Sequence, residues 1–180
     1  MYWSTTSETS WPFVLPESHS FRSILRVLNE QGVNFVVIGG VSAVLQGAPI
    51  NTFDLDVVHA RDSENVDRLM RALAVLEAKY RVPGHSDLCP EVSHLASTGH
   101  QLLMTRFGPM DLLGEVGSGR DYEQLVGDTI TLELDECGPV RVLRLQMIIA
   151  LKEERGDEKD LAVLPILRRL LKETQQRDPA

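Results

Sequence analysis

The segment between Val36 and Val58 constrains the fold more than any other part of the chain. It begins in a short apolar run that ends at two glycines, Gly39 and Gly40. A short helix is expected next, followed by a second strand that opens on a pair of aspartates. A strand that is apolar throughout suits burial on both faces of a sheet. The segment therefore predicts a strand–helix–strand unit inside a domain that mixes helices and strands.

The same segment carries the residues best suited to chemistry. Paired glycines after a buried strand let the backbone approach a ligand closely, and the free N–H groups at the start of the next helix suit an anion such as a triphosphate. Ser42, in the first turn, adds a hydroxyl donor. Asp54 and Asp56 should project side by side because alternate strand residues face the same way, and close carboxylates beside phosphates favour Mg²⁺. Either half alone is more simply a tight turn or a pair of solvated acids, but together they favour a binding site.

The remaining periodicity predicts a mixed central β-sheet flanked by helices, in the α/β or α+β class. Helices are expected at 20–31, 41–45, 63–73, 122–126, 145–155 and 157–171. Strands are expected at 34–38, 54–58, 101–107, 110–113, 129–135 and 140–142, the last two joined as a hairpin. Residues 79–100 contain few apolar positions and are expected to form loops or short strands.

The chain reads as one domain with short appendages. We expect an N-terminal arm over 1–17, the main domain over 18–172 and a flexible tail over 173–180. The arm holds both tryptophans, Trp3 and Trp11. Large aromatic side chains are rarely left in water, so the arm is expected to dock on its own domain or on a second subunit.

Charge and composition argue against several classes of protein. The chain has 18 Lys and Arg against 26 Asp and Glu, a net charge of −8, and extended nucleic-acid binding depends on Lys and Arg that neutralise phosphates. No apolar run approaches the ~20 residues of a membrane span. Two cysteines are too few for a disulfide framework. The expected location is the cytoplasm, with no membrane contact and no extended nucleic-acid track.

The spacing of the glycines and aspartates resembles a known signature. Gly39-Gly40, thirteen further residues and the Asp54-x-Asp56 pair are similar to the motif of the nucleotidyltransferase superfamily, which has the polymerase-β-like fold. Asp111 lies about where this family has a third carboxylate on a later strand. The resemblance implies that the glycine loop binds a nucleoside triphosphate, to which we expect Ser42 to add its hydroxyl. It also implies that the three aspartates are catalytic and bind two Mg²⁺ ions, or Mn²⁺ in their place.

The C-terminal part extends the resemblance to about residues 20–170. The run 148–161 is similar to small bacterial members of the superfamily, among them nucleotidyltransferase components of abortive-infection and toxin–antitoxin systems. Lys152 and Lys159 in this run are candidates for the triphosphate, with solvated helix lysines as an equally weighted alternative. Relatives often carry a basic residue shortly before the aspartate pair, whereas 49–53 holds none.

The resemblance implies a function and leaves one alternative open. The implied activity is Mg²⁺-dependent transfer of a nucleoside monophosphate from an NTP to a hydroxyl of a protein, an RNA or a small molecule. The alternative is a catalytically weak or inactive binding module with the same fold, such as a toxin–antitoxin component. The partners expected are the NTP, an acceptor that the sequence does not identify, and a partner chain or a second copy of this one.

Overall fold

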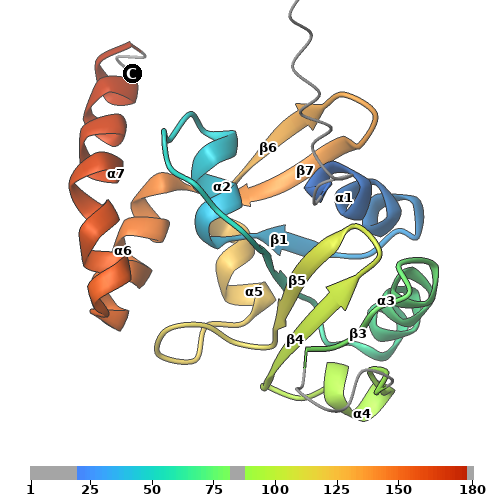
Figure 1. Ribbon diagram of the computed structural model, residues 1–180. Helices are drawn as coiled ribbons and strands as arrows, with labels where there is room; N and C mark the ends of the chain where they lie inside the picture. Colours follow the sequence, from blue (N-terminus) through green and yellow to red (C-terminus); the bar gives the residue numbers. More distant parts are fainter. Residues whose placement is uncertain (1–19, 82–87, 178–180) are drawn as a thin grey trace, which may run out of the picture.

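The fold is built on a seven-stranded mixed sheet with helices on both faces (Figure 1). It is seen in a computed structural model that describes residues 20–81 and 88–177. The strand order is β3-β4-β5-β2-β1-β7-β6. The strands are β1 (Phe35–Val37), β2 (Leu55–His59), β3 (Lys79–Tyr80), β4 (His100–Thr105), β5 (Gly108–Leu113), β6 (Thr129–Leu134) and β7 (Gly138–Leu143).

The middle of the sheet contains both parallel and antiparallel pairs. β2 runs antiparallel to β1 and parallel to β5, and β1 runs parallel to β7. Antiparallel pairs with β4 and β6 then extend the sheet outward, and β3 lies at the β4 edge. The predicted mixed sheet is therefore confirmed, and so is the predicted hairpin of strands 129–135 and 140–142, which the structure forms from β6 and β7.

One face of the sheet is covered by α1 (Phe21–Glu30) and α3 (Ser63–Val75), and α4 (Val92–Leu95) packs beside α3. Both long helices start at a side-chain cap: the Ser20 hydroxyl accepts the Ser23 N–H, and the Asp62 carboxylate accepts the Asn65 N–H. The core between these helices and the sheet is mainly apolar. Its most buried members include Ile24, Leu25, Leu28, Leu55, Val57, Leu69, Leu76, Leu103, Met110 and Leu112.

The opposite face is covered by a different set of helices (Figure 1). They are α2 (Gly39–Leu45), α5 (Tyr122–Leu125) with a 3₁₀ turn over Val126–Asp128, α6 (Leu145–Arg155) and α7 (Glu158–Arg177). Their core includes Val36, Val58, Leu143, Ile148, Leu164 and Leu167. α6 and α7 pack on each other at one side of the sheet, so this face is covered less evenly than the other.

The structure differs from the sequence-based expectations in a few elements. α4 lies in the region expected to form loops or short strands. α7 continues through Pro165 and past residue 171 into the predicted tail, ending at Arg177. An ion pair from Arg169 to Glu173 (2.9 Å) and a hydrogen bond from the Thr174 hydroxyl to a backbone carbonyl support these last turns.

Two further expectations concern the N-terminal arm and membrane-spanning helices. The N-terminal arm, with Trp3 and Trp11, lies outside the described residues. Among the helices of the described residues, none combines the length and the apolar character needed to cross a membrane.

Candidate active site

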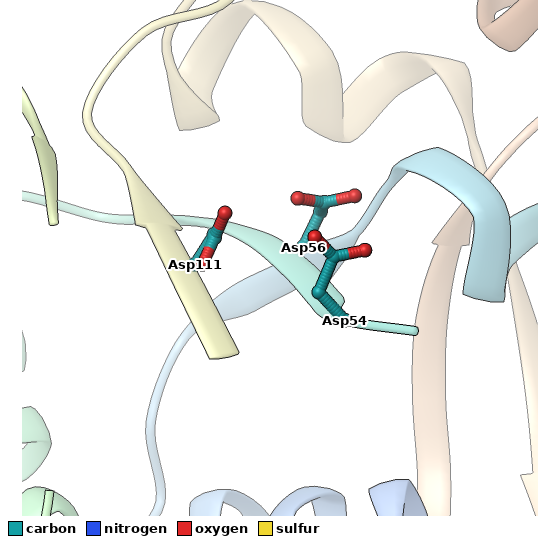
Figure 2. A group of neighbouring side chains, drawn as sticks. All are labelled: Asp54, Asp56 and Asp111. Atoms are coloured by element: carbon teal, nitrogen blue, oxygen red, sulfur yellow. The ribbon is translucent and has the colours of Figure 1, made fainter. Parts of the chain in front are cut away.

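Three aspartates meet at neighbouring ends of two parallel strands. Asp54 directly precedes β2, and Asp56 within β2 lies in register with Asp111 of β5. Because Leu55 and Val57 face the core beneath α1 and α3, the aspartate between them faces the other side of the sheet. One carboxylate oxygen from each aspartate lies within 4.8 Å of the other two, and Figure 2 shows all three side chains on the same side. The structure thus brings the three predicted acids into one cluster.

Gly39 lets helix α2 begin directly against this cluster. Its φ is +63°, and a Cβ atom at this position would lie 2.2 Å from Oδ2 of Asp56. A Cβ atom at Gly40 would lie 2.6 Å from the Thr52 hydroxyl oxygen. The first N–H groups of a helix have no acceptor within it, so the two glycines place backbone donors that lack an acceptor inside the helix beside the carboxylates. α2 begins at the glycines themselves, two residues earlier than expected.

Burial and neighbouring negative charge raise the pKa of Asp56 and of Asp111. The pKa of Asp56 rises from 3.8 to about 7, mainly because the side chain is buried and further because Asp54 and Asp111 are negative. Burial also raises the pKa of Asp111, and Arg81 opposes this effect. A site that holds three acids at this spacing favours a cation between them.

Three cations lie around the carboxylates. A guanidinium N–H of Arg81, the residue after β3, donates to Oδ1 of Asp111. Lys152 and Arg155, both on α6, lower the pKa of Asp56 by their positive charge. Arg81 and Arg155 were not predicted from the sequence.

The remaining predicted residues lie in different environments. Ser42 is completely buried, and its hydroxyl donates to the Leu143 carbonyl (2.9 Å), which ties α2 to β7. Lys152 forms an ion pair with the buried Asp160 of α7. Lys159 is exposed in the first turn of α7 and is not among the cations that act on Asp56.

The cluster fits a divalent cation. Within the described part of the chain, neither the Asp54 nor the Asp56 carboxylate forms a hydrogen bond or an ion pair, so both present free oxygen ligands. Hard cations such as Mg²⁺ prefer carboxylate oxygen and are usually bound by one or two carboxylates together with substrate phosphates. The close approach of Gly39 leaves room for the Asp56 carboxylate that a larger residue would displace.

Comparison with known proteins gives similarity in structure only. No protein-family model matches the chain, and no curated protein matches its sequence. A candidate nucleotidyltransferase of Thermotoga maritima, TM1012, is similar with a TM-score of 0.50 and 21% identity, over 84% of this chain and 90% of that one. The lincosamide antibiotic adenylyltransferase LnuA, solved with lincomycin bound, is similar with a TM-score of 0.55 and 11% identity, over 82% of this chain and 94% of its own. Over more than four-fifths of its length, the chain therefore has the nucleotidyltransferase fold.

Proposed function

We propose that this protein is a Mg²⁺-dependent nucleotidyltransferase that moves a nucleoside monophosphate from an NTP to a hydroxyl of an acceptor. The hydroxyl oxygen attacks the α-phosphorus, the bond between the α- and β-phosphates breaks, and pyrophosphate leaves. The observation that carries the proposal is the cluster of Asp54, Asp56 and Asp111 on a nucleotidyltransferase fold. The similarity to LnuA also supports the proposal, because LnuA is an adenylyltransferase with this fold.

The residues of the site have separate roles in this reaction. Asp54 and Asp56 hold the divalent cations, with Asp111 as the third ligand. When bound, Mg²⁺ neutralises phosphate charge and lowers the pKa of the attacking hydroxyl. Asp111 lies at the end of the cluster on β5, where it can accept the proton of that hydroxyl.

The triphosphate is bound from the α2 side of the cluster. The N–H groups of Gly39 and Gly40, at the start of α2, donate to phosphate oxygens. Lys152 and Arg155, which already act on Asp56, add positive charge at the same place. The chain thus offers acids for the metal and donors for the phosphates from adjoining elements.

Calorimetry of NTP binding with and without Mg²⁺ tests the proposal. The unmodified protein should bind an NTP only with Mg²⁺, and a double variant Asp54→Asn/Asp56→Asn should bind it at least tenfold more weakly, because it lacks two metal ligands. Asp67→Asn, which removes an exposed acid from α3, is the matched control and should bind like the unmodified protein. If the unmodified protein binds neither Mg²⁺ nor any NTP, the proposal is wrong.

A catalytically weak binding module is the second candidate, and one observation favours it. All three cations named near the site are already engaged within the protein. Arg81 pairs with Asp111, Lys152 pairs with Asp160, and Arg155 pairs with Asp157 and Asp160. Incubation with NTPs labelled at the α-phosphate, in the presence of a host lysate, separates the two candidates. Transfer of label to a stable product supports the enzyme, and Mg²⁺-dependent binding without transfer supports the module.

A further inference from the structure

Arg81 is fixed beside the third carboxylate by the backbone of the sheet. Its N–H donates to the Leu102 carbonyl of β4 at 2.9 Å, and Leu102 lies directly across from Asp111 in the β4–β5 pair. The guanidinium then donates to Oδ1 of Asp111. The two side chains are only 28% and 12% exposed, so water screens their attraction less than it would on an open surface.

The three acids are therefore not equivalent. In the described part of the chain, Asp111 is paired with a cation, whereas Asp54 and Asp56 have no partner. The Arg81 guanidinium is also incompletely used, because its Nε is buried and has no partner among the described residues. A guanidinium has five N–H donors in a planar fork, a geometry that matches phosphate as well as carboxylate.

A divalent cation and a guanidinium compete for the same carboxylate. A metal ion that binds all three aspartates must approach Asp111, where Arg81 already places a positive charge. Two positive charges a few ångströms apart repel each other unless an anion lies between them. A nucleotide phosphate is such an anion, and it arrives with the metal.

We propose that Arg81 is a positioning residue with two successive partners: it holds Asp111 while the site is empty, and it binds a phosphate of the NTP once metal and nucleotide are present. This inference rests on the proposed function, because it requires a divalent cation at the three aspartates. It gives the site the basic residue that the segment 49–53 lacks. It also accounts for the incompletely used guanidinium, since the phosphate supplies the acceptors that one carboxylate oxygen does not.

The proposal predicts effects of opposite sign on metal and on nucleotide. Arg81→Gln removes the competitor for Asp111, so Mn²⁺ alone should bind about fivefold more tightly than to the unmodified protein. The same variant lacks the phosphate ligand, so an NTP analogue that resists transfer should bind about fivefold more weakly in the presence of saturating Mn²⁺. Loss of structure would weaken both kinds of binding.

Titration of Mn²⁺ followed by electron paramagnetic resonance, and calorimetry of the analogue, measure the two affinities. Arg106→Gln is the control, because it removes an exposed arginine that directly follows β4 and pairs with Glu77, and it should change neither affinity. Arg81→Lys keeps the charge without the planar fork and tests the proposal again if the glutamine variant does not fold. It should weaken binding of the analogue while leaving Mn²⁺ affinity within twofold of the unmodified protein.

The results separate this inference from the proposed function. If the unmodified protein binds no Mn²⁺, both are wrong. If it binds Mn²⁺ and the NTP analogue, but Arg81→Gln binds Mn²⁺ no more tightly, the metal site stands and the role of Arg81 is wrong. Unchanged nucleotide affinity in both Arg81 variants would also overturn the inference.

Discussion

The two faces of the sheet are made by the same strands and have opposite properties. On the face beneath α1 and α3, β2 contributes Leu55 and Val57, which are fully buried in an apolar core. On the other face the same strand contributes Asp56, with a pKa near 7 and two acids within 4.8 Å. We call these the closed face and the site face.

The difference shows how this fold supports an unfavourable cluster of charges. Burying apolar side chains contributes about 25 cal/mol per Å² of surface removed from water, whereas burying acids beside one another costs free energy unless a cation is bound. Both faces therefore gain stability from apolar burial, but on the site face the cluster of acids reduces it. Substitutions on the two faces should therefore have different effects on stability and on metal binding.

The largest expected effect is on the closed face. Leu112 of β5 is 0% exposed and neighbours Asp111 in the chain, but it faces the opposite core. Leu112→Ala should lower the free energy of unfolding by about 3 kcal/mol, because it removes buried methyl groups and leaves a cavity. Denaturant unfolding measures this loss. Leu161→Ala, at a position on α7 that is 51% exposed, is the control and should cost less than about 0.5 kcal/mol.

The next effect is at the point where α2 meets the site face. Gly39→Ala should lower the free energy of unfolding by about 2 kcal/mol, because alanine is strained at positive φ. It should also abolish Mn²⁺ binding, because the new methyl group would occupy the position of the Asp56 carboxylate. Thermal unfolding and a Mn²⁺ titration measure the two effects. In Gly127→Ala, the control, the new Cβ meets no atom within 4 Å, and metal binding should be unchanged.

A Gly39→Ala variant that binds Mn²⁺ normally would show that Asp56 is not a metal ligand. A stable variant without metal binding would instead show that the glycine serves the site alone and not the fold.

The sequence predicted the closed face and the acids better than it predicted the cations. The start of α3 follows from Asp62, whose side chain caps the helix within three residues. Strand alternation alone predicts that the Asp54 and Asp56 side chains lie on the same face of the sheet. These features depend on neighbours in the chain, so local patterns are enough to predict them.

The features that were not predicted depend on long-range pairing. Arg81 reaches Asp111 because its N–H pairs with Leu102 on another strand. Ser42 donates to a carbonyl 101 residues away, at Leu143. Neither contact has a local periodicity, so neither could be predicted without the register of the sheet.

Ionisation of Asp56 on the site face should lower the free energy of unfolding of the metal-free protein. The pKa of Asp56 is about 7 in the folded protein and 3.8 in the unfolded chain. Between these pH values the folded state keeps a proton that the unfolded state has lost. The stability from this proton is full below pH 3.8 and is lost as the pH rises towards 7. At pH 8, without metal, the ionised Asp56 therefore destabilises the fold.

Asp56→Asn should consequently stabilise the metal-free protein at pH 8 by on the order of 2 kcal/mol, and the gain should vanish near pH 4. Added Mg²⁺ should raise the melting temperature of the unmodified protein and not that of the variant. Calorimetric melting at the two pH values measures both effects. The control Asp67→Asn removes a carboxylate exposed to water and should change stability little at either pH. A destabilised Asp56→Asn protein at pH 8 would contradict the account of the site face.

The smallest expected effect is on the closed face, at a buried polar side chain that is only partly hydrogen-bonded. His59 at the end of β2 is 1% exposed; its Nε2 lies 2.9 Å from the Leu95 carbonyl, and its Nδ1 is buried without a partner in the described residues. Burial, above all, lowers the pKa of this histidine below 6.5. As the pH falls below 6.5, the unfolded chain takes up a proton that the folded protein does not, so stability is lost in acid and is unaffected well above that value.

His59→Gln keeps a side chain that can donate to Leu95 but does not titrate, so it should remove this loss. The gain over the unmodified protein, relative to pH 8, should be about 1 kcal/mol at pH 5. Denaturant unfolding from pH 5 to pH 8 measures it. The pH dependence of stability has the opposite sign at the two residues. Low pH destabilises the fold through His59 on the closed face, whereas high pH destabilises it through Asp56 on the site face. Asp56→Asn and His59→Gln should therefore change the pH dependence of stability in opposite directions. If both changed it in the same direction, the two faces of the sheet would not be independent, as strand alternation predicts them to be.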